Sequence, residues 1–239
     1  MKIRWIVPVV SAVLIIVACL GGWFLFLRNI YNVQGYFKRL PYDVRGYPQG
    51  EVLLIGSSII EYWRSSEADL GPLHTVNVGI GGTRVSFWVE HISALVKPFA
   101  PRAVIMQMGS NNIHGGEGSM SGDEVAAELA ALFETLHREL PGVPLYYISI
   151  LPSFKRQHVW DEARRSNLLV AQMAEQDRDL FFIDCAAALL TGDGNPKPDV
   201  FANDGLHLNP KGYTLWTGVL RPKILGDLYK GDLSLGGAL

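Results

Sequence analysis

The chain contains 239 residues, which suits one globular domain with a sizeable core and an attached segment. Its formal net charge of −2 provides no broad basic surface, so the composition argues against a nucleic-acid-binding protein. The sequence contains no His-Glu-x-x-His motif, no paired-cysteine spacing and no phosphate-binding loop of the Gly-x-x-x-x-Gly-Lys type. It therefore predicts no metal site, no cofactor and no nucleotide.

The first predicted element is an apolar segment, Trp5–Leu27, which has 23 residues and no charge. A helix needs about 20 such residues to cross a bilayer. We therefore expect residues 1–28 to form an uncleaved, single-pass membrane anchor. Lys2 and Arg4 favour a cytoplasmic N-terminus and an extracytoplasmic domain, although Arg28, Lys38 and Arg39 on the other side nearly cancel this bias. A cleaved signal peptide and lipidation at Cys19 are the alternatives.

Residues 29–50 are predicted to form a juxtamembrane linker that contains Pro41 and Pro48. We expect the linker to lie against the surface of the domain that follows. That domain is assigned to residues 51–228, and residues 229–239 form a C-terminal tail.

Short apolar runs then alternate with longer amphipathic ones. The runs do not alternate between apolar and polar residues, which is typical of parallel strands that are covered on both faces. Five such runs are predicted as strands: Val52–Ile55, Thr75–Val78, Ala103–Met108, Leu145–Ile150 and Leu180–Ile183.

Helices are predicted between and after these runs. Ser121 and Glu124 form a capping box before an amphipathic helix at Val125–Leu140. A second helix is expected at Asp161–Gln176, and Asn209 with a following proline opens a third, which ends near residue 228. This alternation of strands and helices predicts a three-layer α/β/α sandwich around a five-stranded parallel sheet.

One pair of side chains after the last strand carries catalytic chemistry. Asp204 precedes His207 by three residues in a glycine-containing turn. At this spacing the carboxylate can accept the imidazole Nδ1–H and leave Nε2 free as a base. Such a base is useful when a nucleophile lies beside it.

Candidate partners follow three other predicted strands. The first strand runs into Gly56-Ser57-Ser58, and the second ends in a turn that includes Gly82. The third ends in Gly109-Ser110-Asn111-Asn112, which offers a side-chain amide. Because ligands of open α/β sheets bind beyond the carboxyl ends of the strands, all these residues are expected at one edge.

The four segments resemble the four sequence blocks of the SGNH (GDSL-type) hydrolases, in the same order along residues 51–225. The subgroup most similar to this chain contains platelet-activating-factor acetylhydrolase and lysophospholipase-type esterases. The resemblance implies a flavodoxin-like sheet and hydrolysis of carboxylic esters, with short-acyl or lysophospholipid-like substrates, without a metal.

The resemblance also implies a role for each site residue. Ser58 corresponds to the nucleophile, His207 to the general base and Asp204 to the residue that orients the imidazole. The oxyanion hole corresponds to the backbone N–H groups of Ser58 and Gly82 and the side chain of Asn111. The other histidines are expected by default to be structural or solvent-facing, and only His114, three residues after Asn111, has a position from which it could line the pocket.

The chain departs from the family pattern at two positions. Ser57 replaces the Asp of Gly-Asp-Ser, which leaves Ser57 as an alternative nucleophile, and Asn112 replaces the Asp that commonly follows the third block. Two other functions also fit the sequence. One is an acetyl-esterase or acyltransferase that acts on cell-envelope glycans, and the other is a catalytically silent, flavodoxin-like binding module.

Overall fold

The computed structural model of the protein describes residues 30–235. The predicted membrane anchor, residues 1–28, lies outside this range. From residue 30 to residue 235, no helix has both the length and the apolar character that crossing a bilayer requires.

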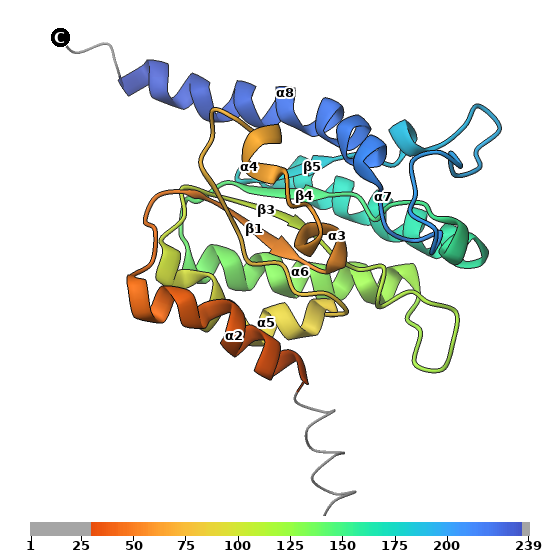
Figure 1. Ribbon diagram of the computed structural model, residues 1–239, viewed down its shortest axis with the longest axis horizontal. Coiled ribbons are helices and arrows are strands. Elements are labelled where there is room, and N and C mark those ends of the chain that lie inside the picture. Colours follow the sequence, from red (N-terminus) through yellow and green to blue (C-terminus); the bar gives the residue numbers. More distant parts are fainter. Residues whose placement is uncertain (1–29, 236–239) are drawn as a thin grey trace, which may run out of the picture.

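The apolar runs form one sheet in which every neighbouring pair of strands is parallel (Figure 1). The spatial order β2-β1-β3-β4-β5 is that of flavodoxin-like sheets. The predicted five-stranded parallel sheet is therefore confirmed. In chain order the strands are β1 (Val52–Gly56), β2 (Thr75–Asn77), β3 (Ala103–Gln107), β4 (Leu145–Ile148) and β5 (Leu180–Ile183).

The helices agree well with the sequence prediction at their starts. The capping box of α6 is present, since Ser121 Oγ accepts the Glu124 N–H and the Glu124 carboxylate accepts the Ser121 N–H. Helix α8 continues past its predicted end because a lone glycine, Gly231, costs only about 1 kcal/mol relative to alanine. The α-helices are α2 (Ile30–Arg45), α3 (Ser58–Glu61), α4 (Ser66–Asp69), α5 (Val85–Leu95), α6 (Gly122–Glu139), α7 (Trp160–Gln176) and α8 (Pro210–Leu235); short 3-10 helices are η2 (Lys97–Phe99), η3 (Phe154–Val159) and η4 (Ala187–Leu189).

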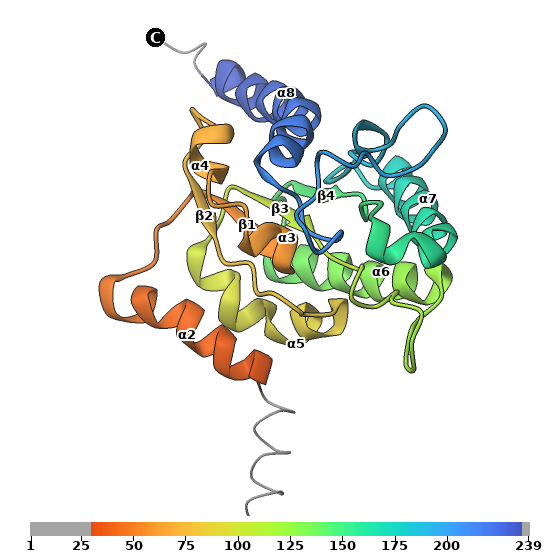
Figure 2. The ribbon, with the colours of Figure 1, turned by 45° about the vertical axis from the view of Figure 1, so that its right-hand side comes forward.

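Both faces of the sheet are covered, which explains the unbroken apolar runs. Leu53 and Ile55 of β1 join a buried core together with side chains of α5, α6 and α7. Val52 and Leu54 join a second core, on the opposite face, with α3 and α8. The three layers are visible in Figures 1 and 2.

The segment that we treated as a linker is largely helical. Helix α2 packs on α5: Gly35 lies against Leu95 and Phe87, and the ring of Tyr42 meets that of Phe99 at 4.9 Å. The glycine and Pro41 obscured this helix in the sequence, because both disfavour helix interiors. Helix α2 begins near the edge where the strands have their carboxyl ends and runs back along α5 (Figure 1).

Candidate active site

Three side chains from distant parts of the sequence form a continuous hydrogen-bonded chain. His207 Nε2 lies 2.8 Å from Ser58 Oγ, and His207 Nδ1 lies 2.5 Å from Asp204 Oδ2. Ser58 opens α3 at the end of β1, whereas the other two residues lie in the loop before α8. This arrangement can take a proton from the serine hydroxyl onto the imidazole.

The carboxylate of Asp204 is fixed by several donors. Its Oδ1 accepts the backbone N–H groups of Leu206 and His207, both at 3.0 Å. Partial burial raises the pKa of Asp204, but the Leu206 N–H and then the His207 ring and N–H outweigh it and lower the pKa to about 2. Asp204 is therefore ionised at neutral pH, and its carboxylate holds a proton on Nδ1 of His207.

The structure distinguishes the two adjacent serines. Ser58 Oγ contacts His207, whereas Ser57 is 1% exposed and its hydroxyl contacts no polar group of residues 30–235. Gly56 sets this geometry with φ +144°, and a Cβ there would lie 2.1 Å from the Gln107 carbonyl oxygen. Only glycine allows β1 to turn so close to β3 and present Ser58 at the edge of the sheet.

The glycine turn lies beside Ser58, and Asn111 is hydrogen-bonded to this turn. Gly82 has φ +79°, and a Cβ at Gly81 would lie 3.5 Å from Ser58 Cβ. Asn111 Nδ2 donates to the Thr83 carbonyl oxygen at 3.0 Å, so the third block is tied to the glycine turn. Within residues 30–235, the backbone N–H groups of Ser58 and Gly82 donate to no other group, and they are available to a ligand.

Asn112 is buried and links the loop after β3 to helices α5 and α6. Its Oδ1 accepts the Val85 N–H at 3.2 Å, and its Nδ2 donates to Glu128 Oε2 at 2.8 Å. An aspartate here would lack the donor and would face a second carboxylate. The side-chain amide of Asn112 therefore fits its partner, the Glu128 carboxylate, better than an aspartate would.

Sequence comparison assigns the family. A profile of the GDSL-like lipase/acylhydrolase family matches residues 55–215, which include all the site residues named above. The chain belongs to this family. It is therefore a carboxylic ester hydrolase. No curated protein sequence matches this acylhydrolase.

Solved structures share its fold at low sequence identity. A protein from Streptococcus pneumonia, provisionally described as a platelet activating factor, is 23% identical with a TM-score of 0.71, covering 87% of this chain and 98% of its own. A GDSL-like lipase from Bacteroides thetaiotaomicron is 18% identical with a TM-score of 0.66, covering 81% and 99%. A carbohydrate esterase family 3 protein from Talaromyces cellulolyticus is 18% identical with a TM-score of 0.59, covering 76% and 99%.

A small cavity adjoins the Ser58 hydroxyl of the acylhydrolase. Its volume is about 10 Å³, close to the space that one water molecule needs. Two of its side chains, Gln107 and Ser153, are buried and have no hydrogen-bond partner among the described residues. It is lined by Ser58, Ile59, Gln107, Ser110, Leu151, Ser153 and Leu206.

Several of these residues were missed by the sequence analysis. Gln107 had a signal, because it is the only polar residue in the apolar run of β3. Tyr62, whose ring meets that of His207 edge-on at 5.0 Å, had none. The loop at residues 152–159 contributes Ser153 to the cavity, whereas the loop at residues 113–120 contributes no residue.

His114 has a structural position. Its Nε2 is 3.0 Å from the Arg84 guanidinium, which also donates to the Gly118 carbonyl oxygen. His114 does not line the cavity at Ser58. The other ring nitrogen, Nδ1, lies 3.1 Å from the Gly116 backbone nitrogen, so His114 connects Arg84 to the loop after β3. Among residues 30–235, no three His, Cys, Asp or Glu side chains are grouped so that they could hold a metal ion.

Proposed function

We propose that this acylhydrolase is a serine esterase that works through an acyl-enzyme. The observation that best supports this proposal is the unbroken hydrogen-bonded chain from Asp204 through His207 to Ser58. Ser58 Oγ attacks the ester carbonyl carbon as His207 Nε2 takes its proton. The carbonyl oxygen becomes an oxyanion, which accepts hydrogen bonds from the Ser58 and Gly82 N–H groups and the Asn111 amide.

The tetrahedral intermediate formed by this attack then collapses. The bond to the alcohol oxygen breaks, and the alcohol leaves with the proton that His207 holds. A water molecule next attacks the acyl-serine carbonyl, and His207 takes a proton from this water. Release of the carboxylic acid returns that proton to Ser58, so the triad ends as it began.

The acyl group that fits best is short. The cavity at Ser58 measures about 10 Å³ and is bordered by Ile59, Leu151 and Leu206. A cavity of this size holds about one water molecule, so only the smallest acyl groups fit it as these side chains stand. Acetyl esters are therefore the proposed substrates, and a lysophospholipid-like ester with a long acyl chain is the less favoured one.

The small cavity also supports a second candidate. Acetyl groups on cell-envelope glycans match it as well as acetyl groups on small alcohols do. Transfer of the acetyl group to a sugar hydroxyl would use the same acyl-enzyme, with the acceptor hydroxyl in place of water. Structural neighbours of the chain include an acetyl-xylooligosaccharide esterase, at 18% identity and a TM-score of 0.58.

The test is hydrolysis by the full-length protein in detergent micelles. We expect p-nitrophenyl acetate to be cleaved much faster than the butyrate and octanoate, and glycan acetates to be deacetylated. Ser58→Ala should abolish both hydrolysis and labelling by a fluorophosphonate, while Ser57→Ala should retain both. Activity that survives Ser58→Ala but is lost in Ser57→Ala would reverse the assignment. Absence of turnover and of labelling in the wild type would favour the silent binding module.

We also propose that residues 1–28 anchor the enzyme in a membrane with its catalytic domain outside the cytoplasm. The apolar run of 23 residues supports this, as do three exposed aromatic side chains on the helix that follows it, Tyr31, Tyr36 and Phe37. The protein should stay with membranes after carbonate washing, and protease added outside intact cells should digest the domain. Release by carbonate would argue against the anchor.

A further inference from the structure

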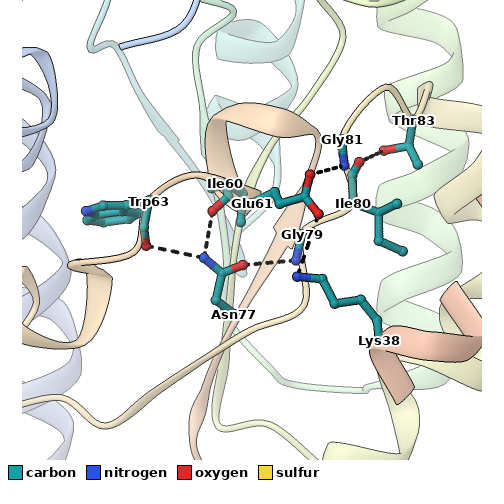
Figure 3. Close-up of polar contacts among 9 residues, drawn as sticks. All are labelled: Lys38, Ile60, Glu61, Trp63, Asn77, Gly79, Ile80, Gly81 and Thr83. Atoms are coloured by element: carbon teal, nitrogen blue, oxygen red, sulfur yellow. Dashed lines mark hydrogen bonds and ion pairs between the residues drawn. The ribbon is translucent and has the colours of Figure 1, made fainter. Parts of the chain in front are cut away.

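The turn that carries Gly82 is flexible by composition, since Gly79, Gly81 and Gly82 lie within four residues. Its first half is held by hydrogen bonds of the Asn77 side chain. The Gly79 N–H donates to Asn77 Oδ1 at 3.0 Å, and Asn77 Nδ2 donates to the Ile60 carbonyl oxygen at 2.6 Å (Figure 3). These bonds end before the peptide that presents the Gly82 N–H.

The second half of the turn is held through the Ile80–Gly81 peptide, whose carbonyl oxygen accepts the Thr83 hydroxyl at 2.8 Å and whose N–H donates to the Glu61 carboxylate. Glu61 Oε2 accepts the Gly81 N–H at 2.9 Å, and Lys38 Nζ of α2 lies 3.8 Å from Glu61 Oε1. Figure 3 shows the Glu61 side chain reaching from the end of α3 to Gly81, with Lys38 approaching the same carboxylate. Glu61 lies three residues after Ser58, so one short helix carries both the nucleophile and this acceptor.

We infer that Glu61 is a positioning residue for the oxyanion hole, and this inference rests on the proposed function. Its carboxylate holds the N–H side of the Ile80–Gly81 peptide, and the Thr83 hydroxyl holds the carbonyl side. The next peptide, which carries the Gly82 N–H, is thereby held toward Ser58. Without this acceptor, the glycine torsions leave the Gly82 N–H free to rotate away from the oxyanion.

The Glu61 carboxylate packs closely against the glycine turn. A Cβ at Gly81 would lie 2.5 Å from Glu61 Oε2, so the glycine is what allows the approach. On the other side of the turn, a Cβ at Gly82 would lie 2.9 Å from the Tyr31 hydroxyl of α2. Helix α2 therefore contacts the turn directly through Tyr31 and, through Lys38, contacts the acceptor that holds it.

The experiment compares variants of the full-length enzyme in hydrolysis of p-nitrophenyl acetate. Glu61→Met fills the same space without an acceptor, and we expect kcat to fall about 10–100-fold with KM little changed, since one oxyanion donor is misaligned rather than removed. Glu61→Gln keeps an acceptor oxygen and should remain within about threefold of the wild type. The control Glu67→Ala removes an acid whose side chain is 72% exposed and should change nothing.

Gly81→Ala provides a second, independent variant. Its methyl group would displace the carboxylate, so it should lower kcat as Glu61→Met does, and the double variant should be no worse than either single one. Thermal unfolding checks that each variant is folded. A Glu61→Met enzyme with unchanged kcat, a defect confined to KM, or equal losses in Glu61→Gln and Glu61→Met would each overturn the inference. If Glu61→Met does not fold, Gly81→Ala takes its place, and an unchanged kcat in that variant would overturn the inference. A wild type without hydrolysis would instead overturn the proposed function.

Discussion

Replacing Asp204 by asparagine should nearly abolish ester hydrolysis without disturbing the fold. In the wild type, Oδ1 accepts two backbone N–H groups and Oδ2 accepts the His207 ring N–H. Asparagine has one oxygen for these three donors. If its oxygen stays on the backbone N–H groups of Leu206 and His207, two hydrogen bonds are kept and one is lost; the reverse orientation loses two. Each bond contributes about 0.5–1.5 kcal/mol, so the first orientation is favoured.

In that orientation the asparagine NH₂ group faces His207 Nδ1. The ring must then accept at Nδ1 and carry its proton on Nε2. A protonated Nε2 cannot take the proton of Ser58, which lies 2.8 Å away. The same exchange in a Ser-His-Asp protease lowers kcat about 10⁴-fold, equivalent to about 5 kcal/mol of barrier, and we expect a similar loss here.

The assay is steady-state hydrolysis of p-nitrophenyl acetate, with kcat and KM measured separately. KM should stay near the wild-type value, because the substitution changes a proton position and leaves the cavity walls intact. The thermal unfolding midpoint, measured at pH 7, serves as the control for folding. A loss in kcat smaller than about tenfold would refute the assignment of Asp204 as the residue that sets the tautomer of His207.

Three further predictions follow from the same site, and one from the loop behind it. Asn111→Ala removes an oxyanion donor and should lower kcat about 10²–10³-fold in the same assay. Leu151→Ala enlarges the acyl cavity and should raise the butyrate-to-acetate ratio of kcat/KM by at least about tenfold. Because the folded-state pKa of Asp204 is about 2, below its ordinary 3.8, the stability that it contributes is complete above about pH 4 and lost as the pH falls toward 2. Unfolding curves of the wild type and Asp204→Ala should therefore converge over that range. Asn112→Asp should cost about 1–3 kcal/mol of unfolding free energy at pH 8, and Glu128→Gln should restore it.

The sheet and the polar clusters were predictable because their signals are local. A buried parallel strand needs an unbroken apolar run, and each run here is followed by a turn with small or polar residues. Topology then brings the carboxyl ends of parallel strands to one edge whatever the details of packing. The hydrogen bond between Ser58 and His207 follows from that rule, although 149 residues separate them.

Helix α2 and Glu61 could not be predicted in the same way. The stability of α2 comes from contacts with α5 and Phe99, which lie far along the chain, and its own Gly35 and Pro41 argue against a helix. Glu61 looks like an ordinary acidic residue at a helix end. Its importance appears only when the glycine turn after β2 is folded over α3, because neither segment contains the contact by itself.

The two departures from the family pattern have different physical explanations. At position 112 the exchange of aspartate for asparagine is matched by Glu128 on α6, which supplies the carboxylate while Asn112 supplies the donor. In this chain the negative charge therefore lies on the neighbouring helix, and the loop supplies the donor of the hydrogen bond. At position 57 the structure offers no such exchange, since the Ser57 hydroxyl is buried and contacts no polar group among the described residues. A hydroxyl costs less to bury unpaired than a carboxylate does, so serine suits this site better than the family's aspartate would without a partner.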